Sequence, residues 1–250
     1  MSRGLGDVYK RQRLRSGGGA TRVLLTGDSG TGKTLTAEVI TGLLGPGKLM
    51  MKANLAALVS KWVGETEKNL DEVFLAAEAS HAVLFFDEAD ALFGKRGEIQ
   101  RGSDRYANLE VGFLLQRLEE FGRDGSAALV ILASNNKDQI DPAFARRFQV
   151  VLHFTRPDAA QRRRLWEIAF PPEAPLSDEV DFDILKQLDL TGAGIVSVAR
   201  NAALLALRDS RTEIGMAEIT RAIARQFQQE ARVLPISELG HHAHWAAESA

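Results

Sequence analysis

One eight-residue segment constrains the fold of this chain more than any other feature of its sequence. Residues 27–34 read Gly-Asp-Ser-Gly-Thr-Gly-Lys-Thr and match the pattern G-x-x-x-x-G-K-[ST] of a phosphate-binding loop, or P-loop. The pattern is specific only where a strand precedes it and a helix follows it. The apolar run 22–26 and the helical pattern 33–44 meet both conditions, so the sequence predicts a strand–loop–helix unit.

Strand and helix patterns alternate over the rest of the first 156 residues. Short apolar runs predict strands at 49–53, 81–86, 127–133 and 150–154, and helical periodicity predicts helices at 66–79 and 104–121. Continuous apolar strands that alternate with helices are typical of a parallel sheet covered on both faces. We therefore expect an α/β fold over residues 21–156, a P-loop NTPase parallel sheet flanked by helices.

The strand pattern ends near Pro157, and the periodicity that follows is helical. Helices are expected at 158–170, 181–188, 193–208 and 216–229. They predict a small all-helical domain over residues 157–233. Residues 234–250 are expected to form a frayed C-terminal tail, although the histidines at 241, 242 and 244 could instead bind a metal weakly.

The first 20 residues show no apolar period and contain three consecutive glycines at 17–19, which predicts a disordered leader. Residues 7–12, Asp-Val-Tyr-Lys-Arg-Gln, look like the translated end of a sequencing adapter. This hypothesis implies that part of the leader is an artefact and that a native N-terminal region is missing.

Composition excludes several classes of function. Lys and Arg total 31 against 33 Asp and Glu, so no bulk positive field attracts nucleic acid or anionic lipid. The absence of cysteine excludes disulfides, cysteine metal sites and a thiol nucleophile. No apolar run approaches the roughly 20 residues of a membrane span, and the N-terminus lacks a secretion signal. We expect a cytoplasmic protein that partners neither a membrane nor nucleic acid.

The P-loop residues have separate expected roles. Glycines let the backbone N–H groups turn toward phosphates, Lys33 pairs with β and γ oxygens, and the Thr34 hydroxyl ligates Mg²⁺. The residues expected to bind the nucleotide here are Gly27, Asp28, Ser29, Gly30, Thr31, Gly32, Lys33, Thr34 and Leu35. The cofactors implied are ATP and Mg²⁺.

Two adjacent carboxylates, Asp87 and Glu88, follow the apolar run 83–86. A parallel strand delivers such residues to its carboxyl end, where ligands of α/β folds bind. We expect Asp87 to hold Mg²⁺ and Glu88 to polarise the attacking water. The alternative is a pair of solvent-facing charges, which the P-loop disfavours.

Taken together, the P-loop, Asp-Glu-Ala-Asp at 87–90 and Ile-Asp-Pro-Ala-Phe-Ala-Arg-Arg-Phe at 140–148 resemble the AAA+ ATPases and, within them, the AAA clade. The resemblance runs from about residue 21 to 233. It implies an ATP-driven homo-oligomeric ring, usually a hexamer, that remodels or unfolds a protein substrate by threading it through a central pore. It also identifies residues 157–233 with the helical lid domain of that family.

The resemblance assigns further catalytic residues. Asn135 falls where the clade has an asparagine, named sensor 1, that orients water, although a strand-end turn would favour the same residue. Arg146 and Arg147 resemble the paired arginine fingers that reach the nucleotide of a neighbouring subunit. Gly192 and Ala193 fall in the lid segment that approaches adenine. No residue is assigned to the second sensor, for which Arg200 is only a candidate.

Residues 61–67, Lys-Trp-Val-Gly-Glu-Thr-Glu, resemble the pore loop of the family. In such a loop an aromatic side chain grips the translocating polypeptide. The resemblance assigns substrate contact to Lys61, Trp62 and Val63. The alternative is that Trp62 is a core residue beside a helix start.

Other functions remain open from the sequence. A GTPase would need Asn-Lys-x-Asp, but Gln139 ends the segment 136–139. A nucleotide-gated scaffold is disfavoured by Glu88 and the paired arginines. A nucleic-acid-directed AAA+ loader is disfavoured by the near-neutral charge, and the arginines at 162–164 suit a surface helix. Residues 105–111 and 146–149 also look similar to the ATPases encoded with bacterial contractile injection systems.

Overall fold

The computed structural model describes residues 19–58, 65–90, 103–123, 128–136, 140 and 142–247. The chain divides into two compact units. The first contains the residues up to Asp28 together with Lys33–Phe154, and the second contains Ser29–Gly32 together with the residues from Thr155 onward.

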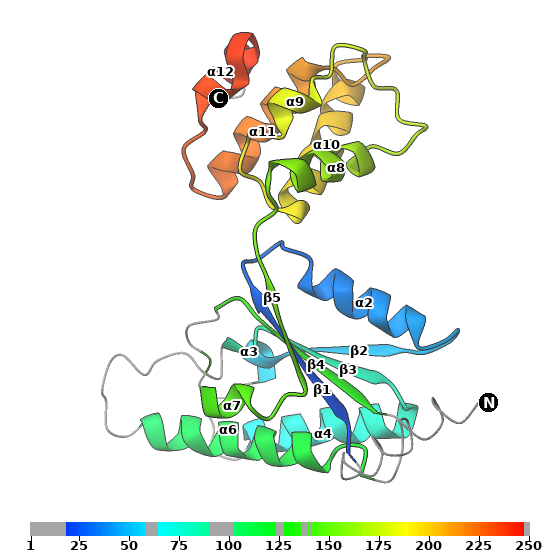
Figure 1. Ribbon diagram of the computed structural model, residues 1–250, viewed down its shortest axis with the longest axis vertical. Helices are drawn as coiled ribbons and strands as arrows, with labels where there is room; N and C mark the ends of the chain where they lie inside the picture. Colours follow the sequence, from blue (N-terminus) through cyan, green and yellow to red (C-terminus); the bar gives the residue numbers. More distant parts are fainter. Residues whose placement is uncertain are drawn as a thin grey trace, which may run out of the picture. The chain divides into compact units, whose positions relative to one another are not determined.

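The first unit is built on a parallel sheet (Figure 1). Its strands are β1 (Thr21–Gly27), β2 (Met50–Asn54), β3 (Val83–Asp87), β4 (Leu129–Ser134) and β5 (Val150–Phe154). Their order is β2-β3-β4-β1-β5, and every pairing is parallel. The α/β prediction is confirmed, and β5 has its predicted bounds.

Helices cover both faces of this sheet. They are α2 (Lys33–Leu43), α3 (Leu55–Leu58), α4 (Glu65–Ser80), α6 (Ser103–Glu120) and α7 (Pro142–Ala145). Figure 1 shows α2 on one face and α4 and α6 on the other. The short helices α3 and α7 were not predicted from the sequence. The strand expected from residue 81 begins at Val83, because His81 has φ +50° and its N–H donates to Glu78 O, ending α4.

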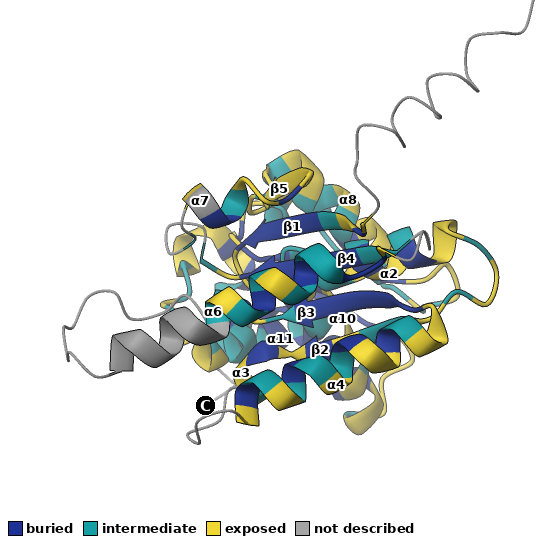
Figure 2. Ribbon diagram, turned by 90° about the horizontal axis from the view of Figure 1, so that it is seen from below, coloured by how far each residue is buried: buried dark blue, intermediate teal, exposed yellow. Residues whose placement is uncertain are grey.

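Successive residues of the central strands enter different cores, which explains their continuous apolar sequences. Leu24 of β1 packs in a core with Phe74 of α4, whereas Leu25 packs in a core with Ala37 of α2. Figure 2 shows β1 and β3 buried along most of their length, while α4 alternates between buried and exposed residues. The register places the carboxyl ends of β1, β3 and β4 at one edge of the sheet.

The second unit is helical. Its elements are α8 (Ala159–Ala169), α9 (Phe182–Leu185), α10 (Gly192–Arg208), α11 (Met216–Gln229), the 3₁₀ helix η1 (Ile236–Ala243) and α12 (His244–Ala247). Trp166 lies fully buried in its core, and the indole N–H donates to Leu185 O at 3.2 Å. Helix α9 is shorter than predicted because Asp181 caps its first turn and its last carbonyls accept bonds from α8 rather than continuing the helix.

The C-terminal segment differs from the frayed tail expected after residue 233. Residues 236–247 form η1 and α12, and Leu239 is completely buried in the core of the second unit. His242 is buried too, and its ring stacks on Trp245 at 5.2 Å between centroids. The expectation failed because the anchoring apolar residues are too sparse to give a helical period.

Candidate nucleotide-binding and hydrolysis site

The P-loop contains glycines where the backbone requires them. Gly27, Gly30 and Gly32 have φ values of +141°, +76° and +102°, a region that side chains strongly disfavour. A Cβ on Gly27 would also lie 2.1 Å from Phe154 O. The loop geometry therefore explains the glycine pattern that the sequence shows.

Lys33 begins α2 with its side chain buried in this loop. Its ammonium donates to Gly27 O at 2.6 Å, to Asp28 O at 2.9 Å and to Asn135 Oδ1 at 3.0 Å. Burial lowers the pKa of this lysine. The Lys33–Asn135 contact joins the first residue of α2 to the residue that follows β4.

Three carboxylates act on the same ammonium. Asp87, Asp28 and Asp90 raise the pKa of Lys33 and so oppose the effect of burial. Neutral carbonyl and amide oxygens nevertheless make its direct hydrogen bonds. A buried cation with neutral partners is suited to exchange them for the more strongly interacting oxygens of a phosphate.

The two predicted acidic residues lie at the end of β3. Asp87 Oδ1 accepts the Glu88 N–H at 3.0 Å, and Asp87 Oδ2 pairs with Lys52 Nζ at 3.1 Å. Glu88 has φ +55°, a strained conformation for a non-glycine residue. The two carboxylates have different partners, Lys52 for Asp87 and Asn54 for Glu88, which is consistent with different tasks for them.

Asn54 is a site residue that the sequence analysis missed. Its Nδ2 donates to Glu88 Oε2 at 2.9 Å. The register pairs Asn54 with Asp87, so parallel pairing of β2 with β3 places the amide beside the two acids. The sequence signal was an amide at the end of a strand. It indicates a site residue only when the pairing of that strand with β3 is known.

Asn135 is also held from its backbone. Its N–H donates to Asp90 Oδ1 at 3.1 Å, and the Ala89 N–H donates to Ala133 O at 2.9 Å. These bonds tie the turn after β3 to the end of β4. The last residue of the Asp-Glu-Ala-Asp segment therefore positions Asn135, whose side chain faces Lys33.

The paired arginines lie after α7. Arg146 is exposed, and Arg147 forms an ion pair with Glu119 of α6. The N–H groups of both arginines donate to carbonyls of α7 or its flank, which fixes the turn that carries them. Their roles as fingers toward another subunit stay a prediction.

The residues predicted to approach adenine lie at the start of α10. Within the second unit, the Ala193 N–H donates to Gly30 O at 3.1 Å. A Cβ on Gly30 would lie 2.7 Å from Thr191 Oγ1, so this glycine leaves room for the cap of α10. The start of α10 and the residues Ser29–Gly32 therefore form one packed group.

The structure says less about the remaining residues that the sequence singled out. The segment with Lys61, Trp62 and Val63 lies outside the described residues, as do residues 137–139 of the tested GTPase motif. Leu35 is 63% exposed on the first turn of α2. Arg162 donates to backbone carbonyls of its own unit and Arg163 pairs with Glu167 and Asp183, so two of the three clustered arginines are engaged in structure.

The donor set fits a magnesium ion carried by a nucleotide. Within the described ranges, no group of three or more His, Cys, Asp or Glu side chains could hold a metal ion by itself. Mg²⁺ prefers oxygen ligands and commonly uses one or two protein groups besides phosphate and water. Thr34 and Asp87 offer such oxygens.

None of the helices in the described ranges is long and apolar enough to cross a membrane.

Comparison with known proteins agrees with this geometry. Residues 23–156 match the model of the ATPase family associated with various cellular activities, AAA. The chain belongs to this family. The matched range of this AAA chain includes the P-loop, residues 27–34, and the acidic pair Asp87 and Glu88.

Curated relatives of this AAA chain extend over both units. It is 33% identical over 235 residues to the ATP-dependent zinc metalloprotease FtsH 3 of Sphaerobacter thermophilus, covering 88% of this chain and 47% of the relative. It is 33% identical over 214 residues to proteasome-activating nucleotidase 1 of Haloferax volcanii, covering 84% and 52%. Human ATPase family gene 2 protein homolog A is 37% identical over 193 residues, covering 75% and 21%. The chain thus spans about half the length of the first two relatives.

The Asn54 contact gives a first prediction. Asn54→Ala is expected to lower kcat about tenfold with little change in nucleotide affinity, because it removes a donor that orients Glu88. Asn54→Asp should lower kcat further, since it sets a second carboxylate against Glu88. Steady-state hydrolysis and nucleotide titration measure both effects. Equal kcat in Asn54→Asp and the parent would contradict the assigned role.

Proposed function

We propose that this AAA ATPase binds ATP with Mg²⁺, hydrolyses it and uses the energy to remodel or unfold protein substrates as a homo-oligomeric ring. The observation that carries the proposal is the meeting of Lys33 with Asn135 at 3.0 Å, beside the strand end that carries Asp87 and Glu88. Phosphate binding and water activation thus have their groups at one edge of the sheet. A cytoplasmic location stays a prediction.

The residues of the chain have separate roles in ATP hydrolysis. Lys33 exchanges its three acceptors, Gly27 O, Asp28 O and Asn135 Oδ1, for phosphate oxygens, and the loss of the last contact frees the Asn135 amide to orient water. Glu88 accepts a proton from that water at its carboxylate. Bound Mg²⁺ would neutralise charge that develops on the phosphates, with Thr34 and Asp87 as its protein ligands.

The ring form of the proposal is supported by the position of the arginines. Arg146 is exposed at a turn with a fixed backbone, a geometry suited to reach a second copy. A guanidinium supplied to a phosphoryl-transfer site is typically worth about 10³- to 10⁵-fold in rate. A hexamer and a polypeptide substrate rest on the family resemblance, including the pore-loop residues Lys61, Trp62 and Val63.

The second prediction tests action in trans. Arg146→Ala is expected to lower the specific activity of assembled protein by about 10³-fold while nucleotide affinity stays the same. Mixing this variant with Glu88→Gln should restore part of the activity. In mixed rings a site with intact Glu88 can receive Arg146 from its Glu88→Gln neighbour.

The test is steady-state ATP hydrolysis across protein concentrations, with particle mass recorded in parallel. Specific activity that rises as particles assemble, together with recovery in the mixture, supports a ring ATPase. Full activity in a particle of monomer mass would overturn the ring. Mixed rings of confirmed mass without any recovery would remove the role of Arg146.

A further inference from the structure

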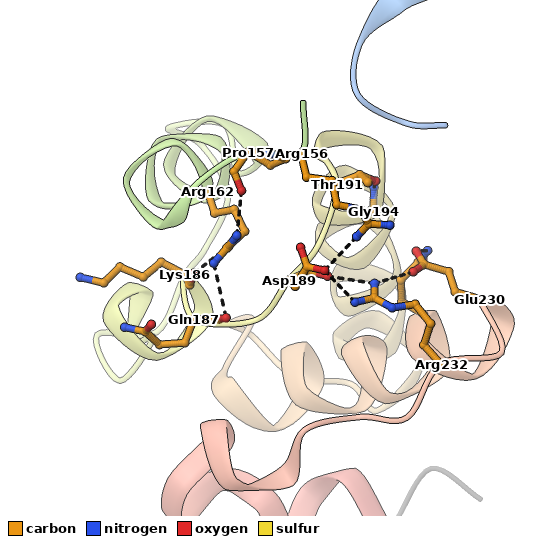
Figure 3. Close-up of polar contacts among 11 residues, drawn as sticks. Arg156, Pro157, Arg162, Lys186, Gln187, Asp189, Thr191, Gly194, Glu230 and Arg232 are labelled. Carbon is orange, nitrogen blue, oxygen red and sulfur yellow. Dashed lines mark hydrogen bonds and ion pairs between the residues drawn. The ribbon is translucent and has the colours of Figure 1, made fainter. Parts of the chain in front are cut away.

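Asp189 lies in the loop between α9 and α10 and is held by two arginines from distant parts of the second unit (Figure 3). Arg156 Nη1 and Arg232 Nη2 both donate to Asp189 Oδ2 at 3.0 Å. Arg232 Nη1 also donates to Asp189 O at 2.9 Å. The side chain and the backbone of one loop residue are therefore fixed together. We call these three residues the Asp189 clamp.

The end of α11 prepares Arg232 for this contact. The Ala231 N–H donates to Gln228 O and the Arg232 N–H to Phe227 O, and Ala231 has φ +52°, which together make a Schellman motif. The Arg232 guanidinium lies 4.7 Å from the centroid of the Phe227 ring. Residues of α11 thus set the position of Arg232 independently of its contact with Asp189.

The other end of the same loop is fixed independently. Arg162 of α8 donates through Nε to Lys186 O at 2.7 Å and through Nη1 to Pro157 O at 2.7 Å. Carbonyls at the end of a short helix such as α9 have no intrahelical partner, so this bond satisfies an otherwise open acceptor. The path from α9 to α10 is therefore constrained at both ends (Figure 3).

Two residues after Asp189, the chain reaches the residues that contact Gly30. Thr191 caps α10, and its Oγ1 accepts the Gly194 N–H at 3.2 Å. The same oxygen lies where a Cβ on Gly30 would meet it at 2.7 Å, and the Ala193 N–H binds Gly30 O. These contacts connect Asp189, through residues 191–193, to Gly30.

We propose that Asp189 is a positioning residue for nucleotide binding: its clamp by Arg156 and Arg232 fixes residues 191–193 in contact with Gly30 before the nucleotide arrives. The proposal rests on the proposed function and deepens it. Asp189 acts through Thr191 rather than by touching the nucleotide. Without the clamp, part of the free energy of nucleotide binding would be used to order residues 191–193.

The exposure of the clamp separates this role from a purely structural one. The side chains of Asp189, Arg156 and Arg232 are 51%, 37% and 30% exposed. Ion pairs with such exposure contribute little to the stability of a fold. A change in affinity without a matching loss of thermal stability is therefore expected.

The test compares Asp189→Asn with the matched control Asp183→Asn in the full chain. Asp183 is likewise paired with two cations, Arg163 at 2.6 Å and Lys186, but these contacts do not involve residues 189–193. Asp189→Asn is expected to raise both the Kd of a fluorescent ATP analogue and the KM for ATP by about three- to tenfold, with kcat unchanged. Asp183→Asn should leave both values at those of the parent. Asp189→Glu, which keeps the carboxylate, should recover part of the affinity.

The outcomes separate the proposal from the function on which it rests. If Lys33→Ala weakens analogue binding by about ten- to a hundredfold while Asp189→Asn binds like Asp183→Asn, the positioning role is overturned and the nucleotide site stands. A lower melting temperature at unchanged Kd and KM in Asp189→Asn would also overturn it. If Lys33→Ala binds the analogue as tightly as the parent does, the proposed function fails and the positioning role fails with it.

Discussion

Glu88→Gln is expected to lower the rate of ATP hydrolysis by about 10²- to 10⁴-fold, the range that general acid–base catalysis typically supplies. Glutamine has nearly the shape of glutamate and retains a carbonyl oxygen that can accept the Asn54 amide, which lies 2.9 Å from Glu88 Oε2. It cannot accept a proton from water at neutral pH. The affinity for ATP is therefore expected to stay within a fewfold of the parent.

Single-turnover hydrolysis and titration with a fluorescent ATP analogue measure these two quantities separately. Glu72→Gln on α4 is the matched control, because the Glu72 side chain is 66% exposed and pairs with Lys68 at 3.9 Å. This control should hydrolyse ATP like the parent. Turnover at the parent rate in Glu88→Gln would show that Glu88 is not the general base.

Lys33→Ala is expected to weaken ATP binding itself, by about ten- to a hundredfold, the value of one hydrogen bond to a charged group. The phosphates would lose their buried cation and would still face the field of Asp87, Asp28 and Asp90, which act on Lys33 in the parent. The loss should appear in Kd as well as in KM, in contrast to Glu88→Gln.

Isothermal titration with ATP and Mg²⁺ measures this loss. Lys48→Ala is the control, since Lys48 lies outside the site and its ammonium donates to His81 O. Thermal unfolding of both variants is needed because Lys33 also satisfies Gly27 O and Asn135 Oδ1. An unchanged Kd in folded Lys33→Ala would contradict a phosphate-binding role for the loop.

The sequence by itself determined the features that depend on neighbouring residues. The backbone of one short turn needs Gly27, Gly30 and Gly32, and all three lie within six consecutive residues. Continuous apolar runs ending in Asp87 or Asn135 identified the buried strands and the polar residues at their carboxyl ends. Each of these patterns arises within about ten residues, so periodicity and turn chemistry were enough to predict it.

Only the tertiary structure decided the contacts between segments far apart in the chain. Asn54 reaches Glu88 because β2 pairs with β3, and Arg232 reaches Asp189 because α11 ends beside the loop that precedes α10. Leu239 is buried because η1 packs on the helical core. The physical reason is that an amide, an arginine or a lone leucine has no local signature of its partner. Its role is fixed by the strand register and helix packing that bring the two segments together.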